Sequence, residues 1–333
     1  MTRSLVIAPQ WIGDAVMSEP LLATLAARGE ALTVAALPWV APVYGAMPQV
    51  GAVIELPFAH GRLNWRARVR LARTLRGRFE VAYVLPNSIK AALVPWLARI
   101  PRRVGYTGEG RWGLLNQRLA NLDGRPPMVA WYGALAGGAP PGGERPRLSV
   151  GAERVAAATA AAGVAPGAYW VFAPGAEYGP AKCWPAAHYA ALARRLHDEG
   201  GLPVLLLGSA KEAALCAGIA QHAPGACRAL AGQVALAEAM ALIAAARGVV
   251  SNDSGLMHVA AAFGVPQAAV FGSTSPEHTP PLNPRARVLW LKEELGLDCA
   301  PCFERVCRFG HTRCLTELGP ERVHAALADA LAG

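Results

Sequence analysis

The chain of 333 residues has no apolar run that reads as a membrane-spanning helix. Its first apolar run, residues 5–8, is broken at once by Pro9, so it does not resemble the core of a secretory signal peptide. A second stretch, residues 155–176, carries no charge, but Gly163 and Gly167 divide it into a helix-like half and a strand-like half. We therefore expect a soluble cytoplasmic protein, one that is still able to work at a membrane surface.

Charged side chains are also scarce, at 17% of the chain, whereas hydrophobic residues make up 53%. This composition argues against intrinsic disorder and indicates well-buried cores. Glycine and proline are frequent but show no period, which excludes collagen and low-complexity segments. Two nucleotide-binding signatures are missing, the dinucleotide pattern G-x-G-x-x-G after a strand and the Walker pattern G-x-x-x-x-G-K-[ST]. The length leaves room for two domains of ordinary size.

Acidic residues are absent between Glu55 and Glu80, and the net charge of the whole chain is +9. Seven arginines fill this interval: Arg62, Arg66, Arg68, Arg70, Arg73, Arg76 and Arg78. The cations that follow are Lys90, Arg99, Arg102 and Arg103. A solvated helix face explains this pattern as well as a surface for a polyanion does. Base-stacking aromatic residues are sparse and no nucleic-acid motif is present, so among polyanions we favour an anionic lipid or a phosphorylated glycan over nucleic acid.

Short apolar runs alternate with helix-like segments along both halves of the chain. Strands are expected at residues 5–8, 32–36, 52–56, 81–85, 169–173, 203–207, 248–250 and 267–272. Helices are expected at residues 15–27, 39–46, 66–75, 89–98, 186–197, 212–221, 236–246 and 321–331. Continuous apolar strands separated by helices predict a parallel sheet covered on both faces, which is a doubly wound α/β fold.

A Gly/Pro-rich segment at residues 136–146 interrupts this alternation, which then restarts. The sequence therefore predicts two Rossmann-like domains, residues 1–145 and 146–320, that face each other across a cleft. The C-terminal helix, residues 321–333, is expected to pack back on the N-terminal domain. In doubly wound sheets ligands bind at the carboxyl ends of the strands, so we look for functional residues in the loops that follow the strands.

The loop after the first strand, PQWIGD (residues 9–14), carries a carboxylate at the start of the next helix. One interpretation of Asp14 is structural, because aspartate is a favoured N-cap and suits the positive end of the helix dipole. The other is functional: Asp14 is a general base that the helix terminus keeps ionised. Its position alone leaves both interpretations open.

The matching loop of the second half, APGAEYGPAKCWP (residues 173–185), contains one of the few lysines of the chain, Lys182. A glycine-rich loop before a helix can hold a diphosphate, and its lysine supplies a point charge; a solvated surface lysine is the alternative. Another strand end carries Glu212. This carboxylate is a candidate for binding ribose hydroxyls, or it is a first-turn acid that the helix dipole favours.

A third polar turn, SNDSGLMH (residues 251–258), joins an expected strand to a helix-like run. A turn that opens a helix at a strand end directs free backbone N–H groups toward a bound phosphate. The candidates for holding phosphate or sugar hydroxyls are Asp253, Ser254, Gly255 and Leu256. His258 is either a buried core histidine or a ligand contact.

Seven cysteines include a cluster near the C-terminus, whose members are Cys299, Cys302, Cys307 and Cys314. The C-x2-C opening suggests a zinc site to which His311 contributes, but the C-x6-C spacing of the second pair is not that of a standard zinc knuckle. Disulfides are not expected in a reducing cytosol. Free thiols that pack a loop or line a site are the alternative to a bound metal.

Taken together, these motifs resemble glycosyltransferase family 9, the ADP-heptose:lipopolysaccharide heptosyltransferases, over nearly the whole chain. The ordered set that carries the resemblance is IGD (12–14), PG (174–175), KCWP (182–185), GSAKE (208–212) and NDSGLMH (252–258). The cysteine-rich tail (299–315) and the run WYGALAG (131–137) are similar to the heptosyltransferase II branch in particular. Arg308 departs from that branch, in which proline is expected after the third cysteine.

The resemblance implies a GT-B fold and an inverting transfer of L-glycero-D-manno-heptose from ADP-heptose to the first heptose of the lipopolysaccharide inner core. ADP-heptose is then a substrate, and no metal or other cofactor is required. The resemblance implies Asp14 as the base toward the acceptor hydroxyl and Lys182 as the cation that stabilises departing ADP.

Each domain then has its own substrate. The C-terminal domain is expected to bind the ADP-sugar, with Glu212 on the ribose and with Asp253 and His258 placing the diphosphate or heptose. The N-terminal domain is expected to meet a phosphorylated lipid A–Kdo–heptose acceptor beside the inner leaflet of the inner membrane. The basic residues assigned to this acceptor are Arg62, Arg66 and Lys90.

Three alternatives stay open at this point. The heptosyltransferase I branch uses the same donor on a Kdo–lipid A acceptor, although the cysteine-rich tail argues against it. A non-catalytic Rossmann-like module would bind nucleotide without turnover. An anionic-lipid-binding protein would bind membranes without any effect of nucleotide.

Overall fold

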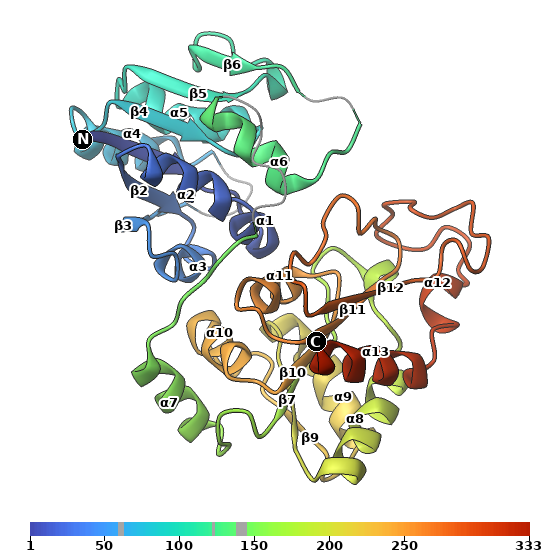
Figure 1. Ribbon diagram of the computed structural model, residues 1–333. Coiled ribbons are helices and arrows are strands. Elements are labelled where there is room, and N and C mark those ends of the chain that lie inside the picture. Colours follow the sequence, from blue (N-terminus) through green and yellow to red (C-terminus); the bar gives the residue numbers. More distant parts are fainter. Residues whose placement is uncertain (59–62, 122–123, 138–144) are drawn as a thin grey trace. The chain divides into compact units, whose positions relative to one another are not determined.

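The computed structural model describes residues 1–58, 63–121, 124–137 and 145–333 (Figure 1). The chain forms two compact units, Met1–Ser149 and Val150–Gly333. From the sequence we placed the boundary at residue 145, a few residues earlier. None of the helices in the described ranges combines the length and the apolar character that a membrane span requires.

The first unit contains one parallel sheet with the strand order β3-β2-β1-β4-β5-β6. Its strands are β1 (Thr2–Ile7), β2 (Glu30–Ala36), β3 (Val50–Glu55), β4 (Val81–Val84), β5 (Arg102–Tyr106) and β6 (Gln117–Leu119). Its helices are α1 (Ile12–Met17), α2 (Glu19–Ala27), α3 (Ala41–Gly45), α4 (Trp65–Leu75), α5 (Ile89–Leu97) and α6 (Met128–Gly133), with 3-10 turns at Gly108–Gly110 and Ala134–Ala136. The chain winds to one side of β1 and then to the other, so the loop after β1 lies where the strand order switches.

The side chains of β1 show why this sheet is covered on both faces. Leu5 and Ile7 lie in a buried core with Leu75 of α4 and Ala92 of α5. Val6 is equally buried, and it points to the opposite face because successive side chains of a strand alternate. A strand whose two faces are both apolar is stable only between two layers of helices, as the sequence pattern predicts.

The second unit repeats this plan, with the strand order β12-β11-β10-β7-β8-β9, all parallel. Its strands are β7 (Trp170–Ala173), β8 (Val204–Leu206), β9 (Cys227–Ala229), β10 (Gly248–Asn252), β11 (Gln267–Phe271) and β12 (Ala286–Trp290). Its helices are α7 (Ala152–Ala161), α8 (Ala186–Gly200), α9 (Ala213–His222), α10 (Leu236–Ala244), α11 (Gly255–Ala262), α12 (Arg313–Thr316) and α13 (Pro320–Ala332), with 3-10 turns at Pro180–Lys182 and Ala210–Glu212. The first strand, β7, lies between β8 and β10, so the loops after β7 and β10 emerge side by side at the switch point.

The C-terminal helix α13 belongs to the second unit. Its apolar residues Val323 and Leu327 are buried in the same core as Trp170 and Phe172 of β7. Leu327 approaches the sheet closely, because a Cβ added at Gly248 would lie 3.2 Å from its side chain. The apolar stripe of α13 is thus buried against the sheet that precedes it in the chain. That this helix also packs back on the N-terminal domain stays a prediction from the sequence.

Candidate functional site

A buried ion pair lies at the carboxyl ends of the second sheet. Nζ of Lys182 is 2.6 Å from Oδ2 of Asp253, and the two side chains are only 13% and 4% exposed. Two hydroxyls share the carboxylate, because Thr274 donates to Oδ2 at 2.6 Å and Thr279 donates to Oδ1 at 3.4 Å. Lys182 is therefore not the solvated lysine of the structural interpretation. A buried charge of this kind is retained only when it is paired and hydrogen-bonded.

Asn252, the last residue of β10, joins the two loops that carry this pair. Its side-chain oxygen accepts from the backbone N–H of Trp184 at 3.0 Å and from the hydroxyl of Tyr189 at 3.1 Å. Its amide nitrogen donates to the carbonyl of Pro174 at 2.6 Å. Since Asn252 is fully buried, this amide fixes the β7 loop against the end of β10 and so sets where Lys182 and Asp253 meet.

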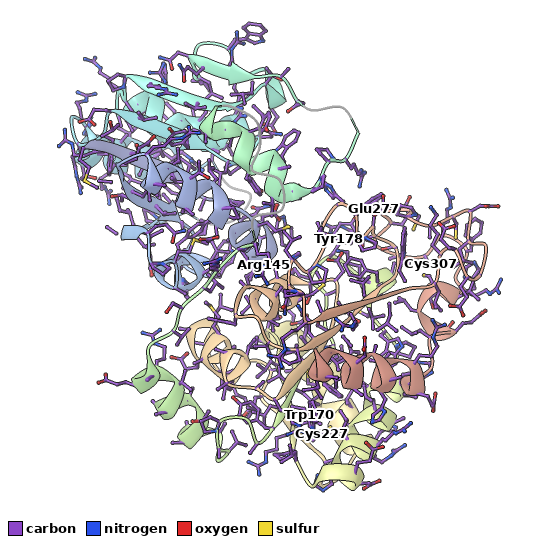
Figure 2. The ribbon with its side chains drawn as sticks, in the orientation of Figure 1. Arg145, Trp170, Tyr178, Cys227, Glu277 and Cys307 are labelled. Atoms are coloured by element: carbon purple, nitrogen blue, oxygen red, sulfur yellow. The ribbon has the colours of Figure 1, made fainter. Side chains whose placement is uncertain are left out.

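A neighbouring loop supports the Lys182 turn from the other side. The backbone N–H of Ala181 donates to the carbonyl of Arg305 at 3.0 Å. Gly179 lies so close to this carbonyl that an added Cβ would be 2.4 Å from its oxygen. Tyr178, which Figure 2 labels, donates its hydroxyl to the carbonyl of Phe303, and its ring lies 5.0 Å from Nζ of Lys182. The lysine is thus held between an acidic partner and an aromatic face.

His258 lies on α11 and is only 5% exposed. The pKa of His258 is lowered to about 4, chiefly by burial; the charge of Asp253 opposes this shift and that of Lys182 adds to it. The imidazole is therefore neutral at physiological pH. It can donate or accept one hydrogen bond to a ligand, but it cannot supply positive charge to a phosphate.

Helix α11 begins at the polar turn, with Ser254 as its N-cap and no side-chain capping bond there. Ser254, Gly255 and Leu256 are partly exposed, whereas the following residues of the helix are buried. The first N–H groups of an α-helix have no partner within the helix. This end of α11 is therefore suited to an anion, next to the Lys182–Asp253 pair.

Glu212 has a defined structural role. It closes a capping box: its Oε2 accepts from the backbone N–H of Ser209 at 2.6 Å. Its carboxylate also fills the space beside Gly175, where an added Cβ would lie 1.7 Å from Oε1. The first-turn interpretation of Glu212 is thus realised in the structure, and the same carboxylate lies next to the backbone of the β7 loop.

In the first unit, Asp14 lies in the first turn of α1, whose N-cap is Trp11. Asp14 is therefore not the N-cap that the structural interpretation assumed, although its charge still suits the positive end of the helix. The hydroxyl of Tyr132 donates to Oδ1 of Asp14 at 2.8 Å. Burial, together with the charge of Asp14, raises the pKa of Tyr132 well above its ordinary value, so the phenol stays protonated.

The arginines of the acid-poor interval divide into two groups. Arg68 is buried: it donates to the carbonyls of Leu63 and Lys90 at 2.6 Å each and lies 4.2 Å from the ring of Phe58. Arg68 therefore joins α4 to α5 and is not part of a ligand surface. The exposed arginines on one face of α4, the α4 arginine stripe, are Arg66, Arg70 and Arg73. Within the described residues they form no ion pair.

The other two residues assigned to the acceptor differ in position. Lys90 lies in the first turn of α5 and is half-buried, with its backbone carbonyl engaged by Arg68. Arg62 lies outside the described residues.

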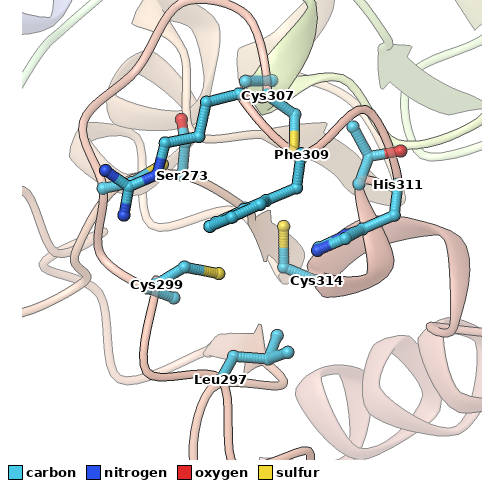
Figure 3. A pocket seen from close by; sticks show the side chains of 13 residues that line it. Ser273, Leu297, Cys299, Cys307, Phe309, His311 and Cys314 are labelled. Carbon is cyan, nitrogen blue, oxygen red and sulfur yellow. The ribbon is translucent and has the colours of Figure 1, made fainter.

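The cysteine cluster lines a pocket in the second unit (Figure 3). Burial opposes ionisation of Cys307, but the backbone N–H groups of residues 309–312 point to its sulfur and lower its pKa below the ordinary value. Burial and the neighbouring thiols raise the pKa of Cys314 to about 11. All seven cysteines are free thiols, and among the described residues no group of three or more His, Cys, Asp or Glu side chains is arranged to hold a metal ion.

Sequence reasoning assigned no role to three residues that the structure places in these sites. They are Tyr132, Asn252 and Thr274. Asn252 lay within a motif that we examined, and Thr274 follows the strand at residues 267–272, so the rule of polar residues at strand ends points to both. Tyr132 and Asp14 are 118 positions apart in the sequence, so no local sequence pattern predicts their hydrogen bond.

Comparison with known proteins gives consistent results. The family model of glycosyltransferase family 9 (heptosyltransferase) matches residues 68–313. The chain is 42% identical over 307 residues to lipopolysaccharide heptosyltransferase 2 of Salmonella typhimurium, covering 87% of this chain and 88% of that protein. It is 38% identical to lipooligosaccharide heptosyltransferase 2 of Haemophilus ducreyi over an alignment that covers 99% of both. The solved structure of Escherichia coli ADP-heptose LPS heptosyltransferase II matches with a TM-score of 0.85 and 38% identity, covering 99% of this chain and 98% of that one.

Proposed function

This chain belongs to glycosyltransferase family 9, the heptosyltransferases, and we propose from that membership that it transfers L-glycero-D-manno-heptose from ADP-heptose to the first heptose of the lipopolysaccharide inner core. Its two-domain α/β fold is of the GT-B type, as the sequence predicted. The observation that carries the proposal is the similarity to heptosyltransferases 2, at about 40% identity along most of the chain. The heptosyltransferase I alternative and the non-catalytic alternative are not favoured.

The proposed reaction divides its work between two groups. Asp14 takes the proton of the acceptor hydroxyl as that oxygen bonds to the anomeric carbon of the donor. The bond from the anomeric carbon to the phosphate oxygen breaks, and ADP leaves with its negative charge increased. Attack from the face opposite the leaving group inverts the anomeric centre. Proton, electron pair and leaving group are then accounted for without a cofactor, and ADP-heptose acts as a substrate.

Lys182 is the proposed stabiliser of the leaving diphosphate. Its ammonium is kept in place by Asp253 and by the ring of Tyr178. The N–H groups at Ser254, Gly255 and Leu256 add donors from the start of α11. Preorganised donors of this kind are worth about 2.7–4 kcal/mol each when they meet charge that develops in the transition state.

The remaining donor contacts follow from positions already described. Neutral His258 would hydrogen-bond the diphosphate or the heptose, with Asp253 beside it. Glu212 would turn the carboxylate oxygen that faces the β7 loop toward the ribose hydroxyls, while its other oxygen keeps the capping box closed.

The acceptor, a phosphorylated lipid A–Kdo–heptose, is proposed to meet the first unit at its basic residues. The α4 arginine stripe offers exposed cations to phosphate groups, and Lys90 and Arg62 are assigned to the same surface. Arginine is suited to this role because its planar guanidinium binds phosphate through two hydrogen bonds. A stripe of this kind would also be attracted to anionic lipid. We therefore place the protein at the cytoplasmic face of the inner membrane, with no nucleic-acid partner.

The deciding experiment gives the purified protein ADP-heptose and two acceptors, Kdo2–lipid A with and without its first heptose, and reads the products by mass spectrometry. Addition of one heptose only to the heptosylated acceptor supports the proposal. Addition only to the unheptosylated acceptor assigns the chain to the heptosyltransferase I activity. Binding of ADP with no product on either acceptor means a non-catalytic nucleotide-binding protein.

A further inference from the structure

The carboxylate proposed as the base is held by a residue from a distant part of the chain. Tyr132 of α6 donates its hydroxyl to Oδ1 of Asp14 at 2.8 Å, in the first turn of α1. Tyr132 is 4% exposed. A buried phenol placed this close to a carboxylate forms a charge-assisted hydrogen bond, which is stronger and more directional than a bond between neutral groups.

The position of Tyr132 is itself fixed by packing. Tyr106 of β5 donates its hydroxyl to the carbonyl of Trp131 at 2.5 Å. The rings of Tyr106 and Trp131 stack, with 3.9 Å between centroids. Helix α6 is therefore held to the sheet immediately before Tyr132. Because its helix is held in place by these contacts, the Tyr132 side chain can fix the orientation of the Asp14 carboxylate.

Two other titratable side chains near α1, those of Tyr44 and Glu19, have hydrogen-bond partners of their own. Tyr44, from α3, shares a hydrogen bond with the hydroxyl of Ser18 at 3.1 Å, and burial raises its pKa, so it is neutral. Glu19, at the start of α2, accepts hydrogen bonds from Gln49 at 2.7 Å and from the backbone N–H of Arg147 at 3.1 Å. Tyr132, by contrast, donates directly to the Asp14 carboxylate.

We infer that Tyr132 is a positioning residue for Asp14: it holds Oδ1 so that Oδ2 takes the proton of the acceptor hydroxyl. The inference rests on the proposed role of Asp14 as base. A carboxylate with one oxygen anchored presents the other in a single orientation, and proton abstraction needs the acceptor hydroxyl within hydrogen-bond reach. A hydrogen bond from a phenol also favours the ionised form of the carboxylate that accepts it.

The test is Tyr132→Phe, which removes only the hydroxyl. Because the lost hydrogen bond is to a charged group, we expect kcat to fall about tenfold or more. The affinity for ADP, measured by calorimetry, should change little. The acidic limb of the profile of kcat/KM against pH should move up by about one unit, because the carboxylate has lost a donor that favoured its charged form.

The matched control is Tyr106→Phe, which removes a buried hydroxyl that holds the same helix but does not touch Asp14. It should lower the melting temperature and leave the acidic limb where it is. If Tyr132→Phe behaves like this control, with an unmoved limb, Tyr132 only supports α6 and the inference is wrong. The variant Asp14→Asn separates the two proposals. If Asp14→Asn keeps activity within about tenfold of the parent protein, Asp14 is not a base. If Asp14→Asn is inactive but Tyr132→Phe leaves the acidic limb of the pH profile unmoved, only the positioning role of Tyr132 is wrong.

Discussion

Replacing Lys182 by methionine tests the buried ion pair most directly. The change keeps most of the aliphatic volume and removes the charge, which leaves the carboxylate of Asp253 buried without its cation. Breaking such a pair from one side costs about 3–5 kcal/mol. We expect the lower end, about 3 kcal/mol, because the hydroxyls of Thr274 and Thr279 still donate to Asp253. For a unit of this size this corresponds to a fall of about 6–12 °C in melting temperature.

The same substitution is expected to remove a donor from the transition state. Loss of one preorganised donor lowers kcat by about a hundredfold to a thousandfold. Transfer is measured as ADP release from ADP-heptose at saturating acceptor, at a temperature where the variant is fully folded. Differential scanning calorimetry on the same preparations gives the melting temperature of the second unit.

Two further variants separate stability from catalysis. In Lys292→Met the lost partner is Glu293, in a surface pair at 3.2 Å whose acid is 84% exposed, and both stability and turnover should stay near those of the parent protein. The double variant Lys182→Met with Asp253→Asn removes the uncompensated charge, so it should recover much of the stability but none of the activity. The reasoning is refuted if Lys182→Met is as stable and as active as Lys292→Met.

Three other predictions follow from local geometry. Charge reversal of the α4 arginine stripe to glutamate should raise the KM for the lipid acceptor at least tenfold, as phosphate contacts are lost, and leave the KM for ADP-heptose unchanged; an equal rise in both would indicate general damage. Gly175→Ala should displace the carboxylate of Glu212 and destabilise the protein by about 1 kcal/mol through loss of the capping box, as measured by urea unfolding. In a Glu212→Ala background the same substitution should cause almost no further loss of stability. Cys307 should react with iodoacetamide at neutral pH well before Cys314, because its lowered pKa gives more thiolate while the pKa of Cys314 is raised to about 11. Peptide mass spectrometry at early reaction times shows the order of modification, and equal rates for the two cysteines would contradict this prediction.

Much of the fold was predictable because the central strands are continuously apolar. The run LVIA beginning at Leu5 and the run GVV beginning at Gly248 carry their assignment in hydrophobicity alone, although β10 continues through two polar residues to Asn252. Four outer strands escaped prediction for a physical reason. Strand β5 begins with Arg102 and Arg103, strand β12 carries Arg287 at its second position, and strands β6 and β9 are three residues long. Neither hydrophobicity nor length distinguishes these four strands from loops.

The site was predictable to the extent that it follows strand ends. Lys182 and Asp253 were found from their loops, but only the strand order brings those loops together. Arg68 shows the opposite case: its sequence neighbours suggest an exposed cation, yet its long side chain lies over Phe58 and holds α4 to α5. Burial of a charged side chain depends on which residues pack over it, and the neighbouring residues in the sequence do not contain that information.

The contact between Gly179 and the carbonyl of Arg305 has a consequence for protein engineering. Any side chain at position 179 would collide with a peptide oxygen that has no room to retreat, since that oxygen already accepts a hydrogen bond from Ala181. The donor-side lysine turn and the cysteine-bearing loop are therefore interlocking parts. A chimera that takes either the Gly179 loop or the Arg305 loop from a distant homologue must take both, because otherwise the two loops will not pack together.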